Sequence, residues 1–219
     1  MFLQGTDSID IDILLFSFLI ALLFGCFCLF LIKSIKLEMK SQKRVFLGYG
    51  LFLLLYGFTR LFFLIAKIYG DLYLIEEKDF YLIWGYLVGL LGVIIIIYIM
   101  ETYLLKTKKI LTTITIILSL INIVALMGLT TKDFALNMIY ILLPSVIVAV
   151  CISYIYLIFK STGSSRRKAT WALIGIVTIF IGHIIYTHIF RSFIEEFPFY
   201  ISPIIIMIGV LIFTVSQLL

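Results

Sequence analysis

The sequence predicts an all-α membrane protein, a bundle of seven transmembrane helices with the N-terminus outside the cell and the C-terminus in the cytoplasm. Hydrophobic residues make up 63% of the 219 residues and charged residues only 13%, whereas soluble domains are about 45–50% apolar and about 25% charged. Apolar runs long enough to cross about 30 Å of hydrocarbon follow one another along the chain. Basic residues gather in alternate loops, which sets the orientation. We therefore expect one domain over residues 1–219, multi-pass in the cell membrane, with the lipid bilayer as its partner.

Seven apolar runs define the predicted helices. They cover residues 11–32, 45–68, 80–104, 110–129, 134–159, 169–190 and 199–219. The first run has no basic leader before it and is followed by lysines instead of a small-residue cleavage site, so we expect it to be retained as a helix. The intervening loops of about 4 to 12 residues leave no room for a soluble domain.

Small residues at helical spacing predict close packing between helices. The two sets are Gly85, Gly89 and Gly92 in the third run, and Gly175, Thr178 and Gly182 in the sixth. Pro144 lies inside the fifth run, where its ring and missing N–H predict a kink.

The distribution of charge predicts the orientation, because loops rich in Lys and Arg stay in the cytoplasm. The first, third and fifth loops hold twelve basic residues: Lys33, Lys36, Lys40, Lys43, Arg44, Lys106, Lys108, Lys109, Lys160, Arg166, Arg167 and Lys168. The opposite side holds only Lys67, Lys78, Lys132 and Arg191, together with ten of the twelve acidic residues. The positive net charge is thus explained by topology, and we expect no nucleic-acid partner. The basic loops are also where a cytoplasmic signalling partner or anionic lipid would bind.

Two ionisable residues are predicted at matching depth in the outer half of the membrane. Arg60 lies fifteen residues beyond Val45, and His183 lies fourteen beyond Ala169, which places both roughly 21–23 Å from the cytoplasmic ends of their helices. Spacings of seven, four and seven put four residues of the second run on one face: Tyr49, Tyr56, Arg60 and Lys67. Thr187 shares a face with His183, and Asn137 and Tyr140 stand at the outer end of the fifth run.

These residues support two interpretations. In the first they form an outward-opening polar cup that binds a small ligand, with Arg60 as an anion-binding or structural cation, His183 as a titratable group and tyrosines as walls. In the second Arg60 snorkels to the outer surface or pairs with an outer acid such as Asp71, Glu76 or Asp79, and His183 is an ordinary hydrogen-bonding group between helices.

Glu101 is the third ionisable residue predicted inside a span, near the cytoplasmic end of the third helix. Heptad-like spacing puts it on one face with Trp84, Leu91, Ile94 and Tyr98. It is either a helix-end acid paired with a basic residue such as Lys106, or, with Tyr98, a switch element that locks helices together at the cytoplasmic end.

The motifs of several function classes are missing from the sequence. The last run, from Pro198 to Leu219, has no lysine to carry a retinal Schiff base, and His183 and His188 are five residues apart with no HExxH pattern around them. We expect no cofactor, no metal and no catalytic residues. Cys26, Cys28 and Cys151 lie in apolar runs and are interpreted as packing residues. Three functions remain: a receptor-like or sensory module, a small transporter or channel that uses Arg60 and His183, and a structural or assembly subunit. The odd number of helices, the outer polar cluster and Glu101 at the inner end all fit the first function, whereas the inner halves of the second and sixth helices carry little polarity for a transport path beyond Tyr49 and Thr178.

Overall fold

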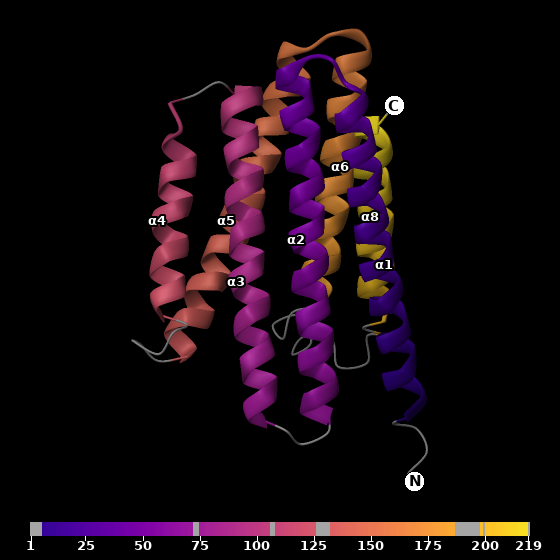
Figure 1. Cartoon of the computed structure of the whole chain (residues 1–219), viewed down its shortest axis with the longest axis vertical. Coiled ribbons are helices and arrows are strands. Elements are labelled where there is room, and N and C mark those ends of the chain that lie inside the picture. Colours follow the sequence, from indigo (N-terminus) through magenta and orange to yellow (C-terminus); the bar gives the residue numbers. More distant parts are fainter. Residues whose placement is uncertain are drawn as a thin grey trace. The chain divides into compact units, whose positions relative to one another are not determined.

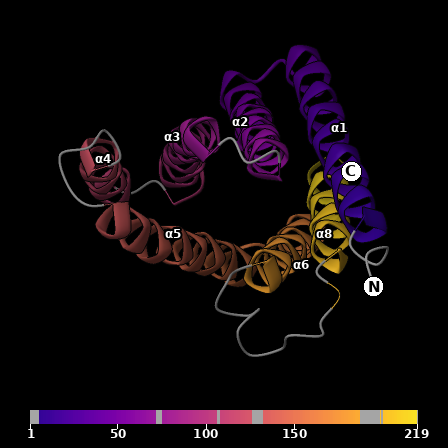
Figure 2. The same cartoon turned by 90° about the horizontal axis from the view of Figure 1, so that it is seen from below.

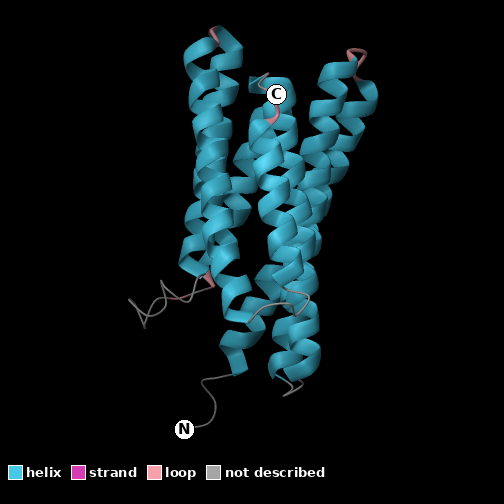
Figure 3. Ribbon diagram, turned by 90° about the vertical axis from the view of Figure 1, so that its left-hand side faces the viewer, coloured by secondary structure: helices cyan, strands magenta, loops and turns pink. Residues whose placement is uncertain are grey.

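The computed structural model describes residues 6–71, 75–105, 108–125, 132–186, 198 and 200–218. All the regular elements in these ranges are helices (Figures 1 and 3). They are α1 (Thr6–Lys36), α2 (Lys40–Asp71), α3 (Ile75–Ile99), a π-helical turn η1 (Met100–Leu105), α4 (Ile110–Val124), α5 (Lys132–Lys160), α6 (Gly163–Tyr186) and α8 (Ile201–Leu218). The all-α prediction is confirmed, and each of the seven predicted runs overlaps one of the described α-helices.

Five of the described helices are long and apolar enough to cross a membrane. They contain the segments Ile11–Lys36, Lys40–Gly70, Asp79–Tyr103, Gly163–Ile185 and Ile201–Leu218. The other two apolar segments, Ile110–Val124 and Pro144–Lys160, are shorter. Pro144 lies within α5, which continues helical on both sides of it. The number of crossings and the orientation remain predictions.

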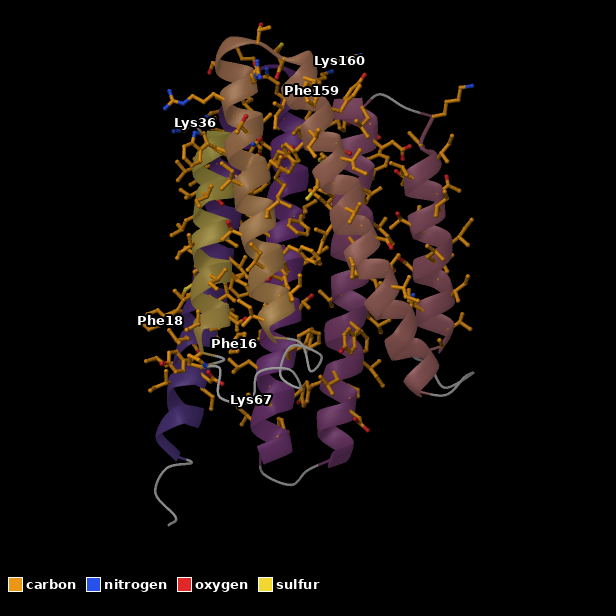
Figure 4. All side chains as sticks on the ribbon, turned by 180° about the vertical axis from the view of Figure 1, so that it is seen from behind. Phe16, Phe18, Lys36, Lys67, Phe159 and Lys160 are labelled. Atoms are coloured by element: carbon orange, nitrogen blue, oxygen red, sulfur yellow. The ribbon has the colours of Figure 1, made fainter. Side chains whose placement is uncertain are left out.

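Large apolar side chains cover the outside of these helices, as expected for helices that face lipid. On α1, Phe16 is 5% exposed and Phe18, two residues later, is 59% exposed; on α5, Phe159 is 81% exposed (Figure 4). A water-soluble domain rarely leaves large apolar areas uncovered. Such a surface is stable in hydrocarbon, where burial of the backbone polar groups inside helices is the main requirement. The structure thus supports a membrane-embedded protein.

The chain divides into two compact units. The terminal unit contains Met1–Leu23 and Tyr154–Leu219, and the central unit is Phe24–Ser153. The boundaries fall inside α1 and α5, so each of these helices contributes to both units.

In the central unit, α3 lies between α2 and α4 (Figure 2). Glycines allow α2 and α3 to approach closely. A Cβ atom on Gly85 would meet the ring of Phe63, one on Gly89 would lie 3.4 Å from the Thr59 hydroxyl, and one on Gly92 would lie 3.5 Å from Cβ of Leu55. The predicted small-residue face of the third run is confirmed as the face that packs on α2.

In the terminal unit, α6 packs on α8 with backbone against backbone. A Cβ atom on Gly175 would lie 2.8 Å from the carbonyl oxygen of Gly209, and one on Gly182 would lie 3.1 Å from that of Ser202. The buried hydroxyl of Ser202 donates a hydrogen bond of 2.8 Å to the carbonyl of Gly182. The two glycines of the predicted face therefore meet α8, whereas the Thr178 hydroxyl donates to Ile174 within its own helix.

Candidate functional site

Arg60 is held inside the central unit by the side chain one turn before it. The residue is 2% exposed, and its Nε and Nη2 donate to the Tyr56 hydroxyl at 3.3 and 3.1 Å. The guanidinium carbon lies 5.2 Å from the centre of the Tyr56 ring, and that ring stacks on Phe52. The side chain follows the tilt of the Cα–Cβ bond toward the start of its helix. It thus points away from the end of α2 that carries Lys67, which argues against the predicted snorkelling to the outer surface.

The other predicted members of the cup are distributed along the chain. His183 is half-buried on α6 in the terminal unit. Thr187 lies outside the described residues, and Asn137 and Tyr140 lie on α5 at positions whose side chains are not described. The structure therefore brings Tyr56 and Arg60 together, and the assembly of the complete cup stays a prediction.

Glu101 caps the N-terminus of α4. One carboxylate oxygen accepts a bond of 3.1 Å from the Leu111 N–H, and the other accepts bonds of 2.7 Å from both the N–H and the hydroxyl of Thr112. Glu101 is 1% exposed. The N-cap residue, Lys109, has a left-handed backbone with φ of 60° and offers no side-chain cap, so a carboxylate from the preceding helix binds the N–H groups that a helix N-terminus leaves unpaired.

The predicted face that joined Glu101 to Trp84, Leu91 and Tyr98 is wrong. Those three side chains are 45%, 50% and 38% exposed, whereas Glu101 is buried. The cause is η1, because a π turn takes more residues per turn than an α-helix and rotates every residue after its start to a new direction. The predicted partner Lys106 lies outside the described residues.

Cations and aromatic rings meet at the same end of the central unit as Glu101. The Arg44 Nη1 donates to the Tyr103 hydroxyl at 3.5 Å. The Lys109 ammonium lies 5.3 Å from the Tyr98 ring centre, and the Lys33 ammonium lies 5.6 Å from that of Phe46. Lys36 and Lys67 mark opposite ends of this unit (Figure 4). The first and third loops, both of them basic, thus share one end of this unit, as the predicted topology requires.

A buried polar stripe on α4 was missed by the sequence reasoning. Its residues are Thr112, Thr115, Ser119 and Asn122, all between 0 and 6% exposed. Around them α4 turns large apolar side chains outward, such as Ile117, Leu120 and Ile121 at 52%, 55% and 41% exposure. The signal was present, because four polar residues at spacings of three, four and three inside an apolar run occupy one helix face.

These arrangements provide a buried cation, a buried carboxylate and a row of neutral oxygen atoms. Among the described residues no group of three or more His, Cys, Asp or Glu side chains could hold a metal ion. The chemistry on offer is binding through charge and hydrogen bonds, with the cation on α2 and the oxygen atoms on η1 and α4. No protein-family model, curated protein or solved structure matches the chain.

Proposed function

We propose that the protein is a receptor-like or sensory module of the cell membrane, in which all seven helices cross the bilayer and a small anionic ligand binds at Arg60. The observation that supports this is the guanidinium itself. Arg60 lies within an apolar span with 2% of its surface exposed. Charged groups inside a membrane are costly and are a functional site by default.

The surroundings of Arg60 suit an anion. Arginine is charged at physiological pH and presents a planar fork of donors that matches a carboxylate or phosphate. Tyr56 orients that fork and Phe52 supports the tyrosine ring. In a site of low dielectric constant the attraction between the cation and an anionic ligand is far larger than in water.

A ligand at this site can move helices because α2 packs tightly on α3, and α3 continues through η1 into the contact with α4. The basic loops at that end would then bind the cytoplasmic signalling partner. The alternative is a small transporter or channel. It is favoured by the buried polar stripe of α4, because this row of polar side chains leads through the membrane-spanning bundle to the Glu101 carboxylate and could line a path for a solute.

The anion site is tested by reaction rates at a single cysteine. Tyr56→Cys is made in a background without Cys26, Cys28 and Cys151, and is treated from each side with small anionic and cationic methanethiosulfonates. We expect modification from outside only, with the anionic reagent faster, and loss of that preference on adding Arg60→Gln. The matched control Lys67→Gln leaves the preference in place.

Each other result contradicts the proposal in a defined way. Reaction from both sides favours the transporter, and no reaction from either side, in a protein that elutes as a single species, leaves Arg60 as a packing residue. Equal rates for the two reagents remove the argument for an anionic ligand.

A further inference from the structure

Side-chain oxygen atoms without a hydrogen-bond partner gather along one face of α4. Among the described residues four buried side-chain polar atoms have no partner, and three belong to the central unit: Thr102 Oγ1 on η1, and Ser119 Oγ and Asn122 Oδ1 on α4. Ser119 is 0% and Asn122 is 1% exposed. Buried polar atoms are almost always hydrogen-bonded because their lost hydration must be replaced, so two without a partner, one turn apart on one helix face, indicate an occupant that the protein atoms do not supply.

The other polar side chains of the stripe also have oxygen atoms on this face that can accept hydrogen bonds. The Thr115 hydroxyl donates its hydrogen to the Leu111 carbonyl, and the Thr112 hydroxyl donates its hydrogen to Glu101. Asn122 donates from Nδ2 to the Leu118 carbonyl. The two threonine hydroxyls have used their only hydrogens, and the Asn122 Oδ1 can only accept, so the oxygen atoms of Thr112, Thr115 and Asn122 are left as acceptors. The occupant must therefore donate hydrogen bonds.

Water fits this requirement. A buried water needs two to four polar partners, and roomy polar sites in proteins are filled by water whereas apolar cavities stay dry. The stripe offers such partners at every turn from Asn122 to Thr112, a distance of roughly 15 Å along the helix. Its end at Thr112 meets the carboxylate of Glu101.

We propose that the buried face of α4 carries a file of water molecules that leads to Glu101. The route follows the stripe of α4 from Asn122 to Thr112, where the Glu101 carboxylate on η1 accepts the two bonds from Thr112. The water file brings water to the buried carboxylate of Glu101. The exposed face of α4 cannot do this, because it is apolar.

If water fills the buried face of α4, a cysteine on that face should react faster with a water-soluble thiol reagent than a cysteine on the exposed apolar face of the same helix. Ser119→Cys and Leu120→Cys are made separately in the cysteine-free background, and each protein, in lipid nanodiscs, is treated with 2-aminoethyl methanethiosulfonate. The two positions are at almost the same depth, but Ser119 is buried in protein and Leu120 is 55% exposed on the outer face. Since the thiolate is the reactive form and needs water to ionise, we expect Ser119→Cys to react at least about tenfold faster.

Thr115→Cys against Ile114→Cys repeats the comparison one turn closer to Glu101, and serves if Ser119→Cys does not fold. Ile114 is 48% exposed. Faster reaction at the stripe position supports the water file. A rate at the stripe position equal to or below that of its outward neighbour, in protein that elutes as a single species, overturns it and leaves the stripe as a dry packing surface.

Discussion

Glu101 shows how one residue can hold a charge inside an apolar protein. An ionised carboxylate is tolerated there only when hydrogen bonds replace its hydration. Two N–H groups and one hydroxyl at the start of α4 do this, and the positive end of the α4 dipole adds to the stabilisation. Arg60 is a buried cation, and it is stabilised by donating to the Tyr56 hydroxyl and by lying next to the Tyr56 ring.

Glu101→Gln should destabilise the protein, because an amide group replaces one of the two acceptor oxygens with a donor that faces N–H groups. Hydrogen bonds to charged groups are worth about 1.5–3 kcal/mol, and we expect a loss of that order. It is measured as a lower temperature of unfolding in detergent, followed by a fluorogenic reagent for the buried Cys26. Glu38→Gln is the control, because Glu38 is exposed between α1 and α2. Equal unfolding temperatures for the two variants would show that the cap carries no stability.

Tyr56→Phe removes the hydroxyl that accepts both bonds from Arg60 and keeps the ring. We expect a loss of about 1–3 kcal/mol, the cost of leaving buried donors without their acceptor. Tyr200→Phe, at a position 43% exposed, should change the unfolding temperature little. If Tyr56→Phe unfolds at the wild-type temperature, the Tyr56 hydroxyl does not hold Arg60.

At the scale of elements, backbone contact between α6 and α8 and the polar packing of α4 distinguish the protein from a generic bundle. The pairs of α2 with α3 and of α6 with α8 both rely on glycine, which suits lipid, where helices associate by close packing instead of by exclusion of water. The glycine spacing made both faces predictable from the sequence. The helix that packs against each glycine face could not be predicted, because residue spacing shows which side chains share a face but not which helix contacts that face.

Gly175→Ala should destabilise the α6–α8 pair. Its Cβ would lie 2.7 Å from the backbone nitrogen of Phe213 and 2.8 Å from the carbonyl of Gly209, and overpacking of this kind costs typically about 1–3 kcal/mol. Gly25→Ala is the matched control within a helix, because nothing lies within 4 Å of its Cβ. Thermal unfolding should separate the two variants, and equal stability would contradict the close approach of α6 and α8.

Length and hydropathy predict the positions of the helices but not their local geometry. Regular helix is predicted through residue 104 at the C-terminal end of the third run, but the π turn from Met100 to Leu105 moves Glu101 off the predicted face. The spacing of the polar residues of α4 predicts that they share one helix face. They were missed because the run 110–129 is identified by its apolar residues alone. The spacing of four residues predicts Tyr56 and Arg60 on one face, and the prediction holds because α2 is a regular helix between them.

At the scale of the whole molecule, the account depends on how many helices cross the membrane. Ile110–Val124 has 15 residues, which at 1.5 Å per residue is shorter than about 30 Å of hydrocarbon. If α4 and α5 cross, the loop between them lies outside, and the water file of roughly 15 Å extends along α4 through only about half of the hydrocarbon. If they turn back together within the membrane, the loop between α4 and α5 does not reach the outer side.

Side-specific labelling at Lys132→Cys decides between these topologies. The variant is made in the cysteine-free background and treated in intact cells with an impermeant maleimide, with Ser161→Cys in the fifth loop, which is basic, as the cytoplasmic reference. The seven-helix account predicts that Lys132→Cys is labelled in intact cells and that Ser161→Cys is labelled only after the membrane is opened. Protection of Lys132→Cys until the membrane is opened, or labelling of Ser161→Cys in intact cells, would contradict it.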